Sequence, residues 1–346
     1  MQRAARRSEI TIDLGALRSN VRRLRAAAGE AELWAVVKAD AYGHGAVDVA
    51  RVALEEGAAA LCVATAPEGE ALRASFADAR ILVMGPLVPG EETFARESRL
   101  EIAVSRPEIP GGFPVHLKVD TGMGRYGMTE EEALSLSRDD VVGLMSHLAT
   151  ADEPDESFAR EQLERFEKLA ERFDGVVRHV ANSAATLRFP DARFDAVRCG
   201  VALYGLSPFG NDPAEHGLEP VLSWRSHVAQ AKELPAGAST GYGRRFRAER
   251  PTRIGLVPVG YADGFRRGLT GAEVLVGETR RRVVGTISMD SFAVELGDEP
   301  EGTPVTLLGD GILAEEHART LGTINYEITC GIRVSAERAE RKVRDG

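Results

Sequence analysis

The chain of 346 residues contains only three cysteines, Cys62, Cys199 and Cys330, and they lie far apart. An odd and scattered set argues against a disulfide framework and indicates a reducing compartment. No apolar run approaches the roughly 18 residues that a membrane helix needs, and no apolar segment follows the basic start as in a secretory signal. We therefore expect a cytoplasmic protein with no membrane partner.

The chain also has fewer basic than acidic residues. Lys and Arg number 43 against 53 Asp and Glu, so the formal net charge is -10. This balance argues against nucleic acid or an anionic membrane as the main partner. The 43% hydrophobic and 28% charged residues are typical of a soluble globular protein, and the length suffices for one large domain and a smaller one.

Short apolar runs alternate with longer amphipathic segments between about residues 30 and 205. The runs lie at 33–37, 60–64, 80–84, 101–104, 115–119, 141–146, 176–180 and 196–199. Helix-like stretches between them include 47–56, 67–75, 130–138 and 156–173. Strands that alternate with helices form parallel βαβ units, and eight such units make a TIM-type (β/α)8 barrel. We predict an α/β fold of this kind.

The sequence pattern changes after about residue 220. Segments 253–259, 273–276 and 304–308 are short, β-branched and separated by Gly, Pro or charged turns. They predict a second, C-terminal, mostly antiparallel β domain. We therefore expect a barrel domain at 1–220 and a β domain at 221–346, with the first strand, near residue 8, either preceding the barrel or pairing with the second domain.

Polar residues follow five of the predicted strands at the point where each strand ends. They are Lys38 after the first, Lys118, Asp120 and Arg125 after the fifth, His147 after the sixth, Asn182 and Ser183 after the seventh, and Arg198 and Gly200 at the eighth. The carboxyl ends of barrel strands meet at one mouth, where barrel enzymes carry out their chemistry. We predict an active site there.

Lys38 is the most informative of these residues, because it ends a run of five apolar residues. A lysine half-withdrawn from water loses its proton readily and forms Schiff bases. Taken alone, each residue has a structural alternative: a snorkelling Lys38, a buried His147, or Ser183 as a helix N-cap. A capped helix start after strand seven and a glycine loop after strand eight together form the usual phosphate site of a barrel. Lysine and phosphate site together indicate pyridoxal phosphate (PLP) chemistry.

Residues 122–127 match the pattern G-x-G-x-x-G and follow a predicted strand. A dinucleotide fingerprint also needs a helix that opens inside the motif and an acidic residue after the next strand. Here Thr129 and Glu132 have capping-box spacing, so the helix should begin later. Arg125 also places a cation among the glycines. The motif is therefore not interpreted as a dinucleotide site.

With these motifs the chain resembles the alanine racemase family, PLP-dependent enzymes of fold-type III, over nearly its whole length. The matching segments are 35–45, 117–125, 146–152, 181–185, 197–205, 241–243, 260–264 and 288–290. One departure concerns a tyrosine that the family commonly carries by the phosphate, shortly after a C-terminal cysteine. No tyrosine follows Cys330 here, and Ser288 stands where a cysteine is often found.

The resemblance implies two catalytic bases in a homodimer. Lys38 would carry PLP as a Schiff base and act on one face of the substrate, and Tyr242 of the partner subunit would act on the other. Arg125 would hold the substrate carboxylate, with support from Met289 across the dimer. Lys118 matches a position that is often carbamylated and orients this arginine.

The resemblance also implies a cofactor-binding set, formed by Lys38, Tyr42, His147, Ser183, Arg198, Gly200 and Val201. His147 would join a hydrogen-bond chain from Tyr242 to Arg198, which faces the pyridine nitrogen. Tyr261 and Asp290 would support the site from the second domain, and no metal is expected. Because arginine cannot accept a proton, the ring should stay neutral, which limits side reactions such as transamination.

The implied activity is interconversion of L-alanine and D-alanine, which supplies D-alanine for cell-wall peptidoglycan. A broad-specificity amino-acid racemase of the same fold remains an alternative, because the residues that shape the side-chain pocket are not evident in the sequence. A decarboxylase on a related barrel, a non-catalytic PLP-binding protein and a barrel enzyme unrelated to PLP are less favoured hypotheses for the same residues.

Overall fold

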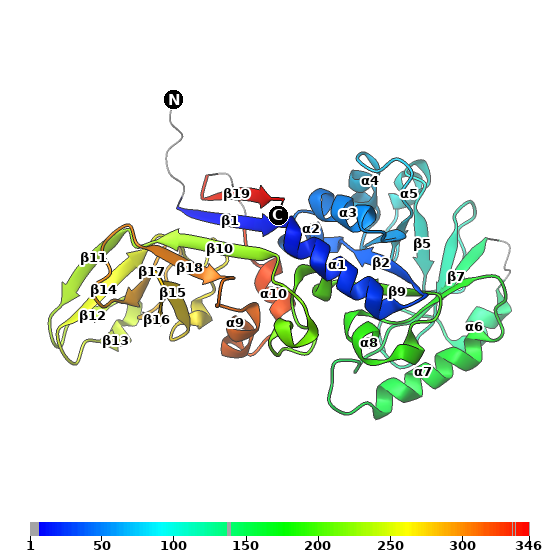
Figure 1. Ribbon diagram of the computed structural model, residues 1–346. Coiled ribbons are helices and arrows are strands. Elements are labelled where there is room, and N and C mark those ends of the chain that lie inside the picture. The colour runs from blue at the N-terminus through cyan, green and yellow to red at the C-terminus, as the bar shows by residue number, and fades with distance from the viewer. Residues whose placement is uncertain (1–6, 137–139, 334, 336, 346) are drawn as a thin grey trace. The chain divides into compact units, whose positions relative to one another are not determined.

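The computed structural model describes residues 7–136, 140–333, 335 and 337–345. The chain divides into two compact units, one of Leu17–Glu219 and the other of Met1–Ala16 with Pro220–Gly346 (Figure 1). No helix of the described residues is long and apolar enough to cross a membrane.

The unit Leu17–Glu219 contains a sheet of eight strands in which every neighbouring pair is parallel. In hydrogen-bonded order they are β8 (Val177–His179), β7 (Val141–Met145), β6 (Val115–Lys118), β5 (Glu101–Val104), β4 (Ile81–Val83), β3 (Ala60–Val63), β2 (Glu32–Val36) and β9 (Ala196–Cys199). Each predicted run overlaps one of these strands, so the predicted parallel sheet is confirmed.

The sheet curls until its edge strands β8 and β9 meet. Asp195 N donates to Arg178 O at 3.1 Å, and Arg198 N donates to Ala181 O at 2.9 Å. Arg178 lies within β8 and Ala181 lies two residues beyond its end, so the strands form a near-barrel. Their carboxyl ends converge on one mouth.

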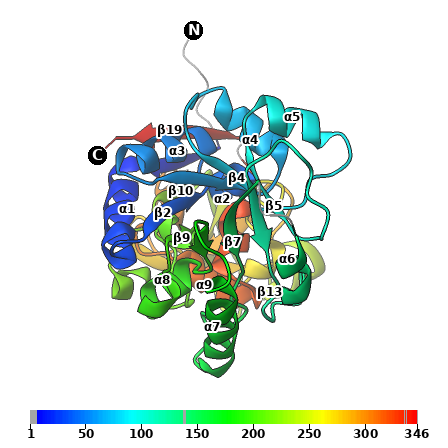
Figure 2. The same cartoon turned by 90° about the vertical axis from the view of Figure 1, so that its right-hand side faces the viewer.

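Right-handed helices lie around the outside of the strands (Figure 2). They are α1 (Leu14–Ala28), α3 (Ala46–Glu55), α4 (Ala66–Arg73), α5 (Glu91–Glu97), α6 (Glu130–Ser135), α7 (Ser157–Ala170) and α8 (Ser183–Arg188). In α7 the buried residues Leu163, Phe166 and Leu169 recur at helical spacing and form the apolar face that packs inward.

The helix after the glycine motif begins where its capping box predicts. Glu132 N donates to Thr129 Oγ1 at 3.2 Å, and Thr129 N donates to the Glu132 carboxylate at 2.8 Å. The helix α6 therefore starts beyond Gly127. It ends at Ser135 because Leu136 is extended, whereas we predicted a helix to residue 138. Residues 137 and 138 lie outside the described residues.

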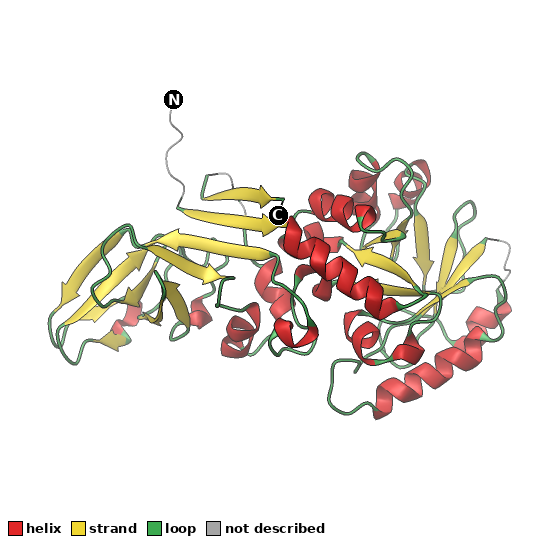
Figure 3. Cartoon of the chain, in the orientation of Figure 1, coloured by secondary structure: helices red, strands yellow, loops and turns green. Residues whose placement is uncertain are grey.

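The other unit is built on a nine-stranded sheet (Figure 3). Its strands in order are β11 (Gln230–Leu234), β14 (Thr252–Val257), β17 (Phe292–Glu295), β16 (Thr279–Val284), β15 (Glu273–Val276), β18 (Pro304–Leu308), β10 (Leu222–His227), β1 (Ser8–Asp13) and β19 (Ala339–Arg344). Only β1 and β19 are parallel neighbours. The predicted mostly antiparallel second domain is confirmed, and the N-terminal strand β1 lies within its sheet.

Smaller elements complete this unit. They are the two-stranded sheet of β12 (Ser239–Thr240) and β13 (Phe246–Arg247), and the helices α9 (Ala314–Leu321) and α10 (Asn325–Cys330). The ring of Phe265 stacks on Phe292 with centroids 4.5 Å apart and meets Trp224 edge-on. All three side chains are buried, so they form part of this unit's own core.

Candidate active site

Lys38 stands at the barrel mouth, two residues after the end of β2, and is half-buried. The four residues that follow it, Ala39 to Tyr42, all have φ between 51° and 56°. Together with ψ values between 34° and 50°, these angles define a left-handed helical turn. Such a conformation costs roughly 1–2 kcal/mol for each residue that has a Cβ. The backbone beside Lys38 is therefore strained, as often occurs at functional sites.

Polar side chains hold this left-handed turn in place. The Glu68 carboxylate accepts a 2.8 Å hydrogen bond from Ala39 N, and Asp40 Oδ1 accepts one of 2.7 Å from Ala46 N. The buried His44 imidazole lies 3.0 and 3.1 Å from two carbonyls of the turn. These bonds offset the strain and fix the direction in which the chain leaves Lys38.

Four cationic side chains surround His147 at the mouth. Burial, with Arg198, Arg125, Lys118 and Lys38 nearby, lowers the pKa of His147 to about 3. Lys118, the last residue of β6, is buried, and its pKa falls to about 8 through desolvation and the neighbouring cations. His147 is therefore neutral at physiological pH, and the excess of positive charge suits an anionic ligand.

Arg198 is buried, and its terminal nitrogens are fully engaged by the protein. Nη1 donates to His179 Nδ1 and to the His179 carbonyl, both at 2.7 Å. Nη2 donates to Ser146 O at 2.7 Å and approaches Val180 O and His147 Nδ1 at 3.3 and 3.4 Å. Within the described part of the chain, Nε–H has no such acceptor. One donor of this guanidinium thus remains for a bound group.

Ser183 and Gly200 meet beside Tyr42. Ser183 Oγ accepts a 3.0 Å hydrogen bond from Gly200 N, just before Val201 begins a 3-10 turn. Because the oxygen accepts here, the hydroxyl hydrogen remains as a donor. A Cβ on Gly200 would lie 2.6 Å from Tyr42 Oη, so any larger residue would have to displace the tyrosine. Asn182, rather than Ser183, caps α8 through Oδ1 at 3.0 Å from a backbone N–H; the alternative interpretation of Ser183 as N-cap is wrong.

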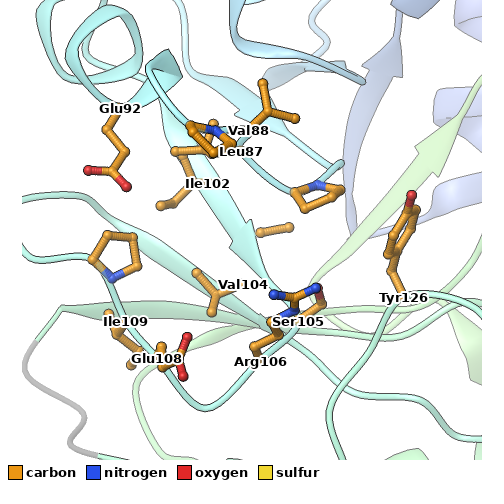
Figure 4. A pocket seen from close by; sticks show the side chains of 14 residues that line it. Leu87, Val88, Glu92, Ile102, Val104, Ser105, Arg106, Glu108, Ile109 and Tyr126 are labelled. Carbon is orange, nitrogen blue, oxygen red and sulfur yellow. The ribbon is translucent and has the colours of Figure 1, made fainter.

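A pocket of about 660 Å³ opens between the loops that follow β4 and β5. Tyr126 stands at one end of it and Glu92 at the other (Figure 4). Lys118 Nζ lies 5.6 Å from the centre of the Tyr126 ring, and Arg125 directly precedes Tyr126. The pocket therefore adjoins the Lys118 side of the barrel mouth.

The remaining predicted residues gather in the other unit, on loops that are distant in sequence. Tyr261 N donates to Ser288 O, and Ala262 N donates to Met289 O, both at 3.1 Å. Thr286 Oγ1 donates to Tyr242 O at 2.8 Å, which joins the third loop to this group. The side chains of Tyr242, Tyr261 and Met289 are 71%, 43% and 52% exposed. Large exposed side chains in one cluster are typical of a contact surface.

Arg338 ties two of these loops together. It forms a salt bridge with buried Asp263 at Nε and donates from Nη2 to Asp290 at 2.8 Å. Asp263 in turn accepts a 2.8 Å bond from Gly260 N. The structure thus gathers Lys38, Tyr42, Lys118, Arg125, His147, Ser183, Arg198, Gly200 and Val201 in the barrel unit, and Tyr242, Tyr261, Met289 and Asp290 in the other.

Sequence reasoning missed several residues that shape the mouth. Glu68 could have been noticed, because Thr65 and Glu68 have capping-box spacing at the start of α4, and the box is present. His116 and His179 lie within strands that we predicted as apolar runs, and both are fully buried. A buried histidine has no sequence pattern of its own, so only its position in a strand of alternating faces could have marked it.

The fold and these residues define a class of barrel proteins with a lysine just after the first strand of the barrel and a separate β domain. Residues 12–208 match the family described as alanine racemase, N-terminal domain, and residues 221–341 match alanine racemase, C-terminal domain. The chain belongs to the alanine racemase family, whose members depend on PLP. The predicted family is confirmed.

Relatives match over nearly their full length. An alanine racemase of Symbiobacterium thermophilum is 41% identical over 93% of this chain and 93% of the relative, and one of Streptomyces coelicolor is 42% identical over 95% and 94%. The crystal structure of alanine racemase from Streptomyces lavendulae has a TM-score of 0.91 at 38% identity and covers 99% of this chain and 98% of that one. The Bacillus anthracis structure with bound L-Ala-P has a TM-score of 0.86 at 36% identity, over 96% of each chain.

Proposed function

We propose that this chain interconverts L-alanine and D-alanine with PLP as cofactor, as a cytoplasmic homodimer that supplies D-alanine for peptidoglycan. The observation that carries the proposal is Arg198, a buried cation at the end of β9 whose Nε–H alone lacks a protein acceptor among the described residues. Relatives named alanine racemase support the same activity.

The residues at the barrel mouth fit PLP. Ser183, Gly200 and Val201 would bind the phosphate, because Ser183 offers a hydroxyl donor and Gly200 brings backbone without a side chain to the same place. Tyr42 lies against Gly200 and would flank the same group. Lys38 would hold the cofactor covalently through its amine. When bound, PLP supplies the electron sink that stabilises negative charge at the substrate Cα.

Two bases on opposite faces of the substrate would exchange its Cα proton. Lys38 would remove or deliver the proton on one face, and Tyr242 of the partner subunit on the other. Tyr242 is 71% exposed, so its hydroxyl is accessible to a second copy of the chain. Racemisation follows because one base removes the proton while the other returns one from the opposite side.

Cations at the mouth would orient the substrate and the cofactor. Arg125 would bind the substrate carboxylate, with Met289 of the partner subunit nearby. A pKa of about 8 leaves part of Lys118 neutral at physiological pH, which is the form that carbamylation requires. Arg198 would donate from Nε–H to the ring nitrogen and cannot accept a proton. His147 is neutral beside it and would connect it toward Tyr242.

Absorbance spectroscopy of the purified protein tests the cofactor assignment. We expect a PLP band that is lost in Lys38→Ala, and its absence from the wild type would refute the proposal. Isotope exchange tests the two bases: Tyr242→Phe should impair proton removal from one enantiomer far more than from the other. Equal impairment would contradict these roles.

A broad-specificity racemase is the second candidate, since the pocket beside Tyr126 is large. Comparable turnover of serine, lysine or arginine beside alanine would favour it. A PLP-loaded chain that exchanges no Cα proton would instead be a non-catalytic PLP-binding protein.

A further inference from the structure

The barrel interior holds a continuous chain of polar side chains, where such barrels usually hold branched apolar residues. It begins at Arg80 and Glu101, at the amino-terminal ends of β4 and β5, where Arg80 Nε donates to Glu101 at 2.6 Å. His116 Nε2 lies 2.8 Å from the other Glu101 oxygen, and His116 Nδ1 lies 2.8 Å from His179 Nε2. His179 Nδ1 then meets Arg198 Nη1 at 2.7 Å.

The residues at the two ends of this chain fix the direction of its hydrogen bonds. Arginine has no acceptor, so Arg198 must donate to His179 Nδ1, which therefore carries no hydrogen. An ionised carboxylate has no donor, so Glu101 must accept from His116 Nε2–H. Hydrogen bonds from His116 and Arg80 keep the pKa of Glu101 below its usual value although burial opposes this, so the carboxylate is charged at neutral pH.

Both imidazoles are neutral, and their tautomers follow from the ends. Burial lowers the pKa of His116, and burial with the nearby Arg198 lowers that of His179 well below its usual value. Each ring then has one N–H, and each must carry it on Nε2. His179 donates to His116, and His116 donates to Glu101. The Trp34 ring lies 4.5 Å from the His179 ring and 5.6 Å from the His116 ring, centroid to centroid, and all three side chains are fully buried.

We infer that Glu101, His116 and His179 form a one-way relay that positions Arg198 and tempers its charge at the mouth of the barrel. In the described ranges no carboxylate oxygen contacts Arg198 directly, so the relay provides its one link to a negative charge. A direct ion pair would neutralise the guanidinium. Two neutral imidazoles instead hold Nη1 in place, leave Nε–H for the ligand and transmit only part of the Glu101 charge. This role rests on the proposed function of Arg198 as the partner of the PLP ring.

Glu101→Gln removes the charge but keeps the relay direction. If the amide nitrogen of Gln donated to His116, each histidine would have to carry its hydrogen on Nδ1. The Nδ1–H of His179 would then face an N–H of Arg198, so the amide oxygen must accept from His116 instead. Glu32→Gln is the matched control. Glu32 lies 3.7 Å from the same Arg80 and accepts from Trp34 Nε1 at 2.8 Å, but it bonds neither histidine. A general loss of charge near Arg80 would affect both variants equally.

The first test is ¹⁵N NMR of the cofactor-loaded full chain with labelled histidine. His116 and His179, assigned with His116→Gln and His179→Gln, should both show the Nε2–H tautomer and stay neutral between pH 7 and 9. They should keep this form in Glu101→Gln. An Nδ1–H or protonated ring at either position in the wild type would overturn the relay, whatever the enzyme catalyses.

The second test compares the bound-cofactor absorbance, kcat and KM of the two variants. A neutral acceptor in place of a charged one should lower kcat about five- to tenfold. Glu101→Gln should also shift the absorbance band of the bound cofactor. Its KM for alanine should change by less than about twofold, because the relay does not touch the substrate. Glu32→Gln should match the wild type. A band shift without any racemisation would support the relay and refute the proposed function. If Glu101→Gln had the absorbance band and kcat of the wild type, the relay would be refuted and the proposed function would be supported.

Discussion

Replacing Ala39 by glycine should stabilise the barrel unit, although the same change in an ordinary helix destabilises it. Ala39 has φ 53° and ψ 49° and is exposed, so the new residue removes no buried contact. Relief of left-handed strain contributes about 1–2 kcal/mol. The greater freedom of glycine in the unfolded chain opposes this by about 0.4–1 kcal/mol. The expected net gain in the free energy of unfolding is about 0.5–1 kcal/mol.

Ala71 supplies the matched control, because it is exposed within the right-handed helix α4. Ala71→Gly should lower the free energy of unfolding by about 0.5–1 kcal/mol. Urea unfolding can be followed through Trp34, which is left as the sole tryptophan by Trp224→Phe in the other unit. Changes of the same sign for Ala39→Gly and Ala71→Gly would refute the left-handed turn.

Three further predictions concern Lys118, Gly200 and Arg338. The pKa of Lys118 is about 8 in the folded chain and 10.5 ordinarily, so the unfolded chain binds more protons between these values. In CO2-free buffer, the free energy of unfolding relative to Lys118→Met should rise by about 2–3 kcal/mol from pH 8 to pH 10.5; a constant difference would contradict the buried amine. Gly200→Ala should cost about 1–3 kcal/mol through its clash with Tyr42 Oη and weaken PLP binding in an absorbance titration. Tyr42→Phe should recover part of that stability loss in a double-mutant cycle, and strict additivity would exclude the clash. Arg338→Gln leaves buried Asp263 without its cation and should destabilise the β unit by about 2 kcal/mol. Urea unfolding followed by Trp224 fluorescence measures this loss, and an unchanged unfolding midpoint would exclude this role of Arg338.

Most of the barrel was predictable because its strands are short apolar runs that end at polar residues or glycine. The positions of Lys38, Lys118 and Arg198 at carboxyl ends also led to the prediction that they share one mouth, since strand direction alone decides which ends meet. The left-handed turn after Lys38 was not predictable. Alanine and aspartate have no preference for four successive left-handed residues, and the turn depends on Glu68, which is distant in sequence.

Buried polar residues of the barrel escaped prediction for a related reason. His116 occupies an alternate strand position like any apolar residue, and its partners Glu101 and His179 come from other strands. Each of these side chains alone would be costly to bury. Only the closed barrel brings them within hydrogen-bonding distance, and only the fixed polarity of Arg198 and Glu101 assigns the proton positions between them. The polar interior is therefore a property of the assembled fold, and its direction follows from chemistry at its two ends.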